Sequence, residues 1–453
     1  MPPTSGPLRC NFKAVTNEAV DSLAVDLVPI VAGANTNIAL LRWDWNGDGT
    51  IDAEDFALSP YAASYEAGHY SPSLFVSNTV GEVVTLKKPD YIRVFPSAVF
   101  VATNGASIFP FNSWSKATRN LQEAVVAVAD GGMVTLSNGT FVISNTPPVV
   151  LAKGIEVRSL NGPRATILRG GRRIELVNPN AALRGVTITA SRGIQMSAGV
   201  VADCIITNCA SHLNISVAPT TGNYRVPGGG GGLISGGLIE RCIIASNTTY
   251  NTANGDAHGG GLYMTGGTAS NCLILANLAY TAAGYSGKSQ GGGVCLAGPG
   301  RLVNCTIARN EVKASNALGS YGGGVYRSNA QSLLQNTIVW FNRGTNTIED
   351  IYTTVSETNM TYSCSPSLTH NPAGTGNITN NPLFVVIGEG FGLTNRYTDG
   401  HLSAESPCRN AGSPDPELAA TLDLDGRPRV SGGRVDMGCY EIPPQKGTFI
   451  LIR

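Results

Sequence analysis

The sequence predicts an all-β protein in which a small β-sandwich precedes a right-handed parallel β-helix. One observation is a glycine-rich phrase that returns about every 30 to 33 residues, a period typical of solenoid repeats. A second is that the segments between these glycines are short, alternating and β-branched, without helical periodicity. A third is that only 14% of the 453 residues are charged, against roughly 25% in an ordinary soluble domain.

Residues 1–95 lack the repeat and are predicted to form the β-sandwich. Their phrase LRWDWNGDGTIDAEDF and the alternating segment after it resemble a PKD-like domain, which is an Ig-like β-sandwich. The residues that carry the resemblance are Trp43, Asp44, Gly47, Asp48, Gly49, the stretch 65–70, Leu74, Val76 and Val80. The resemblance implies a spacer or binding module of a secreted protein rather than a catalytic domain.

The same phrase matches the spacing of an EF-hand-type loop, with oxygen-bearing side chains at alternate positions. The candidate calcium ligands are Asp44, Asn46, Asp48, Thr50, Asp52 and Asp55. Position 12 of the loop is Asp instead of the bidentate Glu, and no clear helices flank it. A tight turn between strands and a calcium site both stay open, and no other cofactor is predicted.

The β-helix is predicted over residues 96–445, followed by a C-terminal strand at 446–453. Its copies align on four glycine triplets, at 230–232, 259–261, 291–293 and 322–324. About ten residues after each triplet, two further columns recur. These columns are Cys242, Cys272, Cys305 and Thr337, and then Asn247, Asn277, Asn310 and Asn342.

Stacked coils lie about 4.8 Å apart, so each coil presents the same residue type to the coils above and below. The cysteines are therefore predicted to point inward as small buried hydrophobes, and no CxxC pair indicates a metal site. The aliphatic residues two positions later also point inward, namely Ile244, Ile274, Ile307 and Val339. The asparagines are predicted to hydrogen-bond along the stack at a turn.

These glycine–apolar and asparagine units resemble those of right-handed β-helix surface proteins, including the repeats of polymorphic outer-membrane proteins. The resemblance covers roughly residues 97–440 and implies a secreted or cell-surface protein. It also implies an amphipathic capping helix at about 114–129 and a closing segment that contains Cys408 and Cys439. Whether these two cysteines form a disulfide stays open.

A glycan-degrading enzyme on the same scaffold is the alternative function. A glycosidase needs two carboxylates close together, but the acids of the repeat, Glu240, Asp256 and Glu311, fall in different columns. The candidates for a polysaccharide lyase are Asp256, His258 and Lys288. Stacking places Asp256 and Lys288 one rung apart, with His258 nearby. A rung-to-rung salt bridge beside a surface histidine explains the same residues without catalysis.

A binding surface is the other interpretation. Ile234, Tyr263, Cys295 and Tyr326 are predicted to share an outward-facing column. The loops before the glycines add Tyr250, Tyr280, Tyr285 and Tyr321, and exposed aromatic rows can stack on sugars or form a protein interface. Scattered surface tyrosines are the alternative.

Net charge, the lengths of the apolar runs and the two ends of the sequence limit the kinds of partner that this protein is expected to bind. Formal charge is zero, which argues against nucleic acid, and no apolar run is long enough to span a bilayer. The start MPPTSGPLRCNFKAV shows no secretory signal, which is expected to be absent from this chain. The strand at 446–453 could cover the last coil or pair with another strand of its own chain. Added instead to a neighbouring subunit, it would build a fibre. The sequence therefore favours an extracellular structural or adhesive protein that binds a glycan or itself.

Overall fold

The computed structural model describes residues 6–144, 146–213, 228–252, 255–284, 287–314, 319–345, 347–356, 358–370, 374–386, 388–394, 399–415, 417, 420–430 and 433–443. The chain forms two compact units, one of residues 1–119 and 126–134 and the other of residues 120–125 and 135–453. The predicted domain boundary after residue 95 stays a prediction. Among the described residues, no helix is long and apolar enough to cross a membrane.

The first unit is a small β-sandwich of mostly antiparallel strands. One sheet has the order β1-β3-β6, with β1 (Arg9–Ala14), β3 (Ser22–Ala32) and β6 (Tyr61–Glu66). The second has the order β5-β4-β8-β9, with β4 (Ile38–Asp44), β5 (Ala53–Asp55), β8 (Ser73–Asn78) and β9 (Val83–Lys87). A short sheet has the order β2-β10-β7, with β2 (Glu18–Val20), β7 (Gly68–Tyr70) and β10 (Ile92–Phe95).

The core of this unit lies between the inward faces of its strands. Side chains alternate along β3 and β8, so that every second residue, such as Leu27 and Leu74, is buried. The intervening residues of each strand are more exposed. Phe12 and Trp43 meet edge to face in the middle, with ring centroids 5.3 Å apart. β11 (Ala98–Val101) and β12 (Met133–Leu136) follow in the chain.

The helix predicted at about 114–129 is much shorter, because α1 spans only Leu121–Ala127. The residues before it pair with β11 instead, since Thr118 donates its N–H to the Phe100 carbonyl at 3.1 Å. Asn120 then begins the helix by accepting a hydrogen bond from the Gln122 N–H at 2.9 Å, as an N-cap residue does. The prediction of a four-turn helix was therefore wrong at its start.

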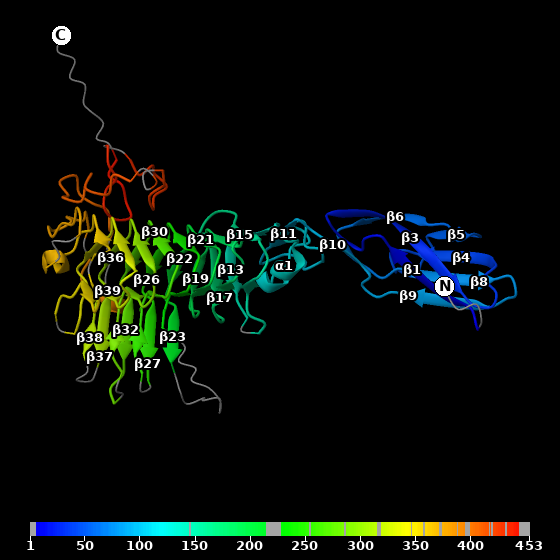
Figure 1. Cartoon of the computed structure of the whole chain (residues 1–453), viewed down its shortest axis with the longest axis horizontal. Coiled ribbons are helices and arrows are strands. Elements are labelled where there is room, and N and C mark those ends of the chain that lie inside the picture. Colours follow the sequence, from blue (N-terminus) through cyan, green and yellow to red (C-terminus); the bar gives the residue numbers. More distant parts are fainter. Residues whose placement is uncertain are drawn as a thin grey trace, which may run out of the picture. The chain divides into compact units, whose positions relative to one another are not determined.

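The second unit is a stack of coils in which every neighbouring pair of strands is parallel (Figure 1). The first sheet contains, in order, β15 (Glu156–Ser159), β18 (Ala182–Arg184), β21 (Val200–Ala202), β25 (Leu238–Glu240), β30 (Thr268–Ser270), β35 (Arg301–Val303), β40 (Leu333–Gln335) and β43 (Met360–Thr361). The second sheet contains β13 (Gly139–Val142), β16 (Thr166–Arg169), β19 (Thr187–Thr189), β22 (Ile205–Thr207), β26 (Ile243–Ala245), β31 (Leu273–Leu275), β36 (Thr306–Ala308) and β41 (Ile338–Trp340). The third sheet contains β14 (Val150–Leu151), β17 (Ile174–Leu176), β20 (Ile194–Met196), β24 (Gly232–Ile234), β29 (Leu262–Met264), β34 (Val294–Leu296), β39 (Val325–Arg327) and β42 (Ile351–Thr353). The predicted fold class, a parallel β-helix after a β-sandwich, is thus confirmed.

The later coils also carry a fin between the second and third sheets, which the sequence did not predict (Figure 1). Its outgoing layer contains β23 (Ala210–Leu213), β27 (Thr248–Asn251), β32 (Leu278–Thr281) and β37 (Glu311–Ala314). Its returning layer contains β28 (Ala257–His258), β33 (Ser289–Gln290) and β38 (Ser320–Tyr321). Ala257, Ala279 and Val312 form a small core inside the fin.

The asparagine column forms a continuous ladder of side-chain amides. The Nδ2 of Asn247 donates to the Oδ1 of Asn277 at 3.0 Å, and Asn277 donates to Asn310 at 2.9 Å. Asn310 donates in the same way to Asn342 at 2.9 Å, and the last partner is the Asp350 carboxylate at 2.8 Å. All five side chains are buried. The ladder therefore satisfies backbone and amide groups at the turn between the second sheet and the fin.

The cysteine column lies beside it in the core and hydrogen-bonds as well as packs. Each member points inward, is essentially unexposed and donates to the carbonyl oxygen two residues earlier. These donor–acceptor distances are 3.2 Å for Cys242, 3.1 Å for Cys272 and 3.3 Å for Cys305, and Thr337 makes the same bond at 3.0 Å. The column is thus a row of polar donors, and this explains why threonine replaces cysteine at its end.

One coil is shifted by a residue from the sequence alignment. Gly232 pairs with Leu262, so the triplet 229–231, and not 230–232, matches 259–261. A Cβ at Gly232 would lie 3.0 Å from Leu262 and 3.1 Å from Ile194, because neighbouring side chains already fill its place in the core. Five consecutive glycines at 228–232 left the sequence without a signal for this register.

The C-terminal segment, which comprises the described residues between 399 and 443, covers the outer face of the second sheet. Cys439 donates its N–H to the Thr306 hydroxyl at 3.0 Å, and Tyr440 packs with Leu273. Two short 3-10 helices, η2 (Pro366–His370) and η3 (Gly392–Thr394), precede it. All ten cysteines are free thiols, so Cys408 and Cys439 are not bonded. The strand predicted at 446–453 lies outside the described residues.

Candidate binding surface

An aromatic column runs along the outer face of the third sheet. Tyr263, Cys295, Tyr326 and Tyr352 lie in register on the successive strands β29, β34, β39 and β42. Side chains alternate along a strand, and Leu262 and Met264 fill the core on either side of Tyr263. The tyrosines therefore point outward, and each is half-buried. We call Tyr263, Tyr326 and Tyr352 the aromatic column.

Two rings of this column stack along the axis of the β-helix, and Tyr263 lies two rungs before Tyr326, on the far side of Cys295. Tyr326 and Tyr352 are nearly parallel, with an interplanar angle of 6° and centroids 5.9 Å apart. Tyr321 of the fin packs against Tyr352 at 4.5 Å, and His258 of the fin packs against Tyr263 at 5.5 Å. Aromatic rings from the returning layer of the fin and from the third sheet thus lie on one surface. They meet there because the glycine triplets connect the returning layer of the fin to the strands of the third sheet.

Two members of the predicted column behave differently. Ile234 pairs with Met264 and is fully buried in the core, so Leu233 is the residue in register with Tyr263. This error follows from the one-residue shift at the glycines. Cys295 does lie in the column but is only 1% exposed, because the fin covers it. Burial and the nearby Asp256 carboxylate raise the pKa of its thiol, which leaves it protonated and unreactive.

The three lyase candidates lie together beside this column, on β28 and β33 or next to them. Asp256 accepts a hydrogen bond from the backbone N–H of Lys288 at 2.8 Å. The Lys288 ammonium lies 5.7 Å from the centre of the Tyr321 ring. Among the described residues, no salt bridge joins it to Asp256. His258 Nδ1 lies 3.9 Å from the Cys295 sulfur. His258 therefore contacts the third sheet, whereas Asp256 and Lys288 make their contacts within the returning layer of the fin.

The other predicted tyrosines occupy a different surface. Tyr250 and Tyr280 stack with centroids 5.2 Å apart, on the outgoing layer of the fin. Their neighbour Thr249 points toward the returning layer, where its hydroxyl donates to the Gly259 carbonyl at 2.8 Å. By alternation, Tyr250 and Tyr280 face away from the aromatic column. Tyr285 lies outside the described residues.

The calcium-like phrase forms the turn between β4 and β5. The Asp44 carboxylate accepts hydrogen bonds from the N–H groups of Gly47 at 2.7 Å and Gly49 at 3.0 Å. Asp48 caps the Thr50 N–H at 2.7 Å, Asn46 accepts from the Asp48 N–H at 2.8 Å, and Asp52 accepts from the Trp45 N–H at 2.9 Å. These are bonds of a tight turn.

The sixth candidate ligand lies at the other end of the hairpin. Asp55 pairs with Leu41, three residues before Asp44, and therefore lies roughly 10 Å from it along the strand. In the part of the chain that the structure describes, no three His, Cys, Asp or Glu side chains gather closely enough to hold a metal ion. The turn interpretation accounts for these bonds, and the calcium site stays a prediction.

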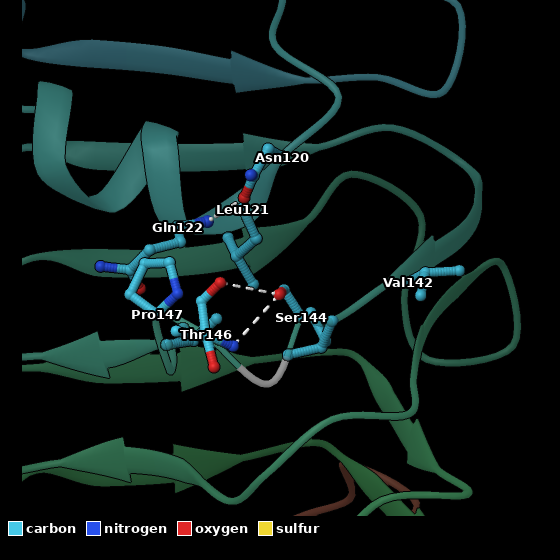
Figure 2. A pocket seen from close by; sticks show the side chains of 9 residues that line it. Asn120, Leu121, Gln122, Val142, Ser144, Thr146 and Pro147 are labelled. Atoms are coloured by element: carbon cyan, nitrogen blue, oxygen red, sulfur yellow. Dashed lines mark hydrogen bonds between the residues drawn. The ribbon is translucent and has the colours of Figure 1, made fainter.

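A small cavity lies near the start of the β-helix (Figure 2). Its volume is about 70 Å³, and its walls include Leu121, Gln122, Val142 and Pro147. Ligand pockets usually enclose about 300 to 1,000 Å³. The cavity is therefore too small for a sugar ring and leaves the aromatic column as the stronger candidate.

A titratable cluster in the C-terminal segment was missed by the sequence analysis. His401 hydrogen-bonds with Asp399 through Nδ1 and with Asp425 through Nε2, the latter at 3.1 Å. Its ring stacks on Tyr440, with centroids 3.7 Å apart. Burial alone would lower the pKa of His401, but the bonds to the two carboxylates outweigh it and raise the pKa. Asp399 lies two residues before His401, but Asp425 and Tyr440 are distant from it in sequence, and no spacing pattern marked them.

Comparisons with known proteins leave the family open. No protein-family model matches the sequence, and no protein with a curated description matches it. Among solved structures, a rhamnogalacturonan lyase is similar, with 11% identity and a TM-score of 0.29. That match covers 68% of this chain and 95% of the lyase chain. A likeness at this level does not bear on the activity of this chain.

Proposed function

We propose that this protein is an extracellular, non-catalytic adhesive β-helix that binds an extended glycan along the aromatic column. The observation that carries the proposal is the set of outward-facing rings in one column, with Tyr326 and Tyr352 on adjacent rungs and Tyr263 two rungs before Tyr326. Tyrosine combines an apolar ring with a hydroxyl, which suits the alternating apolar and hydroxyl surfaces of a sugar chain. Because the column runs along the axis, it fits a polymer better than a single sugar.

The local environment supports binding over chemistry. Burial, and secondarily the Cys295 thiol, raise the pKa of Tyr263 and of Tyr326, so both hydroxyls stay neutral. Neutral hydroxyls donate and accept hydrogen bonds as a sugar requires. Asp256, the nearest carboxylate among the candidates, is committed to the Lys288 N–H.

Glycan-array binding tests the proposal. The double variant Tyr263→Ala/Tyr326→Ala is expected to lose at least tenfold in affinity for the glycan that the unmodified protein binds. Tyr250→Ala/Tyr280→Ala is the matched control, because it removes two stacked tyrosines from the outgoing layer of the fin, which faces away from the aromatic column. Binding that survives the first change, or that only the control abolishes, would overturn the proposal.

Glycan cleavage is the second candidate, because Asp256, His258 and Lys288 lie on adjacent rungs beside the column. Incubation with the bound glycan, followed by chromatography of chain length, separates the two functions. Shortening that disappears in Lys288→Met, with binding retained, would establish a glycan-cleaving enzyme. An unchanged chain length supports the adhesive function.

A further inference from the structure

The early coils of the β-helix carry an excess of positive charge that the neutral total hides. Between residues 151 and 200 the sequence holds eight basic and two acidic residues, whereas the whole chain has 31 of each sign. Some of these charges are paired, as in the contact of Arg184 with Glu156 at 3.6 Å. The unpaired ones concentrate at one corner of the coil.

That corner lies between the second and third sheets, in the coils that precede the fin. Ile174 and Ile194 pair on β17 and β20, so Arg172 and Arg192, each two residues earlier, occupy the same position on adjacent rungs. The rung spacing is about 4.8 Å. Arg169, at the end of β16, borders the same turn. Arg169, Arg172 and Arg192 are all exposed.

Arg173 supplies the buried part of the corner. Its side chain is 6% exposed and donates to the carbonyls of Ile194 at 3.0 Å, Gly228 at 3.1 Å and Gly229 at 3.0 Å. Burial and then the charge of Arg192 lower the pKa of Arg173 to about 10, so it stays charged at neutral pH. Within the described residues, none of Arg169, Arg172, Arg173 and Arg192 forms an ion pair. The sequence from 214 to 227 holds no acidic residue either.

We propose that this arginine corner, formed by Arg169, Arg172, Arg173 and Arg192, binds the carboxylate or sulfate groups of an anionic polysaccharide. Guanidinium groups bind oxyanions in a bidentate manner, and Arg173 fixes the corner from inside. This inference rests on the proposed function, because it names the chemical class of the glycan.

The register connects the corner to the aromatic column. The column of Arg172 and Arg192 continues through Gly230 to Gly260, which lies three residues before Tyr263. Arg192 is therefore two rungs from Tyr263, roughly 10 Å along the axis. A single polymer chain along the third sheet would place an anionic group at the corner while its rings lie on the tyrosines.

Titration calorimetry with three probes tests this inference: polygalacturonate for carboxylates, dextran sulfate for sulfates and unmodified dextran as the neutral polymer. Arg172→Gln/Arg192→Gln is expected to weaken binding of at least one anionic polymer tenfold or more, and to reduce the dependence of that binding on salt. The polymer affected identifies the anionic group. Arg173 is left intact, because its bonds hold the fold. The matched control, Arg164→Gln/Arg301→Gln, removes two exposed arginines elsewhere on the β-helix.

The outcomes separate this inference from the proposed function. If Tyr263→Ala/Tyr326→Ala abolishes binding and the arginine variant leaves it within twofold of the original, the corner is not a site and the adhesive function stands. If the arginine variant alone abolishes binding, the corner binds the anion and the aromatic column does not bind the glycan. Equal losses in the control, or equally tight binding of duplex DNA, would show unspecific attraction and overturn the inference.

Discussion

Asn342 makes two hydrogen bonds to one oxygen of Asp350, from its backbone N–H at 2.7 Å and from its side-chain amide at 2.8 Å. Asp350 thus occupies the place of the next asparagine in the ladder, with a carboxylate in a buried site. Its second oxygen has no hydrogen-bond partner among the described residues, and burial raises the pKa of this carboxyl to about 7. The end of the ladder is therefore a titratable weak point.

We expect Asp350→Asn to stabilise the protein at high pH. An aspartate whose pKa is raised in the folded state contributes stability below its unfolded pKa of about 3.9, and loses this contribution as pH rises toward 7. Asparagine keeps the accepting oxygen and cannot ionise. At pH 8, the free energy of unfolding obtained from thermal melts is expected to be higher for the variant than for the original protein. The gain is up to roughly 4 kcal/mol, reduced by the cost of leaving the amide N–H of the new asparagine unpaired. The difference should shrink toward pH 4, and a gap that grows at low pH would contradict the assignment.

The cysteine column yields a matched-pair prediction. Threonine and valine have nearly the same shape, but only threonine can donate to the Ser270 carbonyl, as the Cys272 thiol does at 3.1 Å. Cys272→Thr is therefore expected to be more stable than Cys272→Val by about 1 kcal/mol in urea unfolding. Equal stability would show that the column acts only as packing, as the sequence suggested.

Repetition made the β-helix predictable, since it repeats the inward residues and the asparagine column in every coil. Ile244, Ile274, Ile307 and Val339 are all buried as predicted. The register between neighbouring coils could be predicted only where successive residues of the sequence differ from one another. At the glycine run 228–232 nothing distinguishes one register from the next, and this misplaced Ile234.

The candidate surface was harder to predict, because it depends on two sheets meeting. The sequence placed Tyr263 and Tyr326 in an outward column, but it treated 248–258 as a loop and did not predict the fin. The fin is what buries Cys295 and brings His258 to Tyr263. The arginine corner was hidden for a similar reason, because its members align only after the register of β17 and β20 is known.

The turns of the coils predict a stabilising substitution. Ala276 has a φ of 56°, in the left-handed region that costs a residue with a Cβ about 1 to 2 kcal/mol. Ala276→Gly removes this strain, and we expect stability to rise by about 1 kcal/mol. Ala279→Gly is the control, because this alanine lies in the regular strand β32 and packs inside the fin. It should lose stability in the same urea titration, and a loss in both variants would show that packing outweighs strain at Ala276.

His401 predicts a pH dependence for the attachment of the C-terminal segment. The imidazole donates to both Asp399 and Asp425 only when it is protonated, and its pKa is raised by these bonds. A raised histidine pKa contributes stability that is complete below about pH 6.5 and is lost as pH rises through the folded pKa. We therefore expect His401→Gln to lower the melting temperature most at pH 6 and least at pH 9. Hydrogen exchange at the Cys439 amide, which bonds to Thr306 of the second sheet, should accelerate in parallel. His69→Gln, in the β-sandwich, serves as the control, and an equal effect of both variants at all pH values would contradict the role of the two carboxylates.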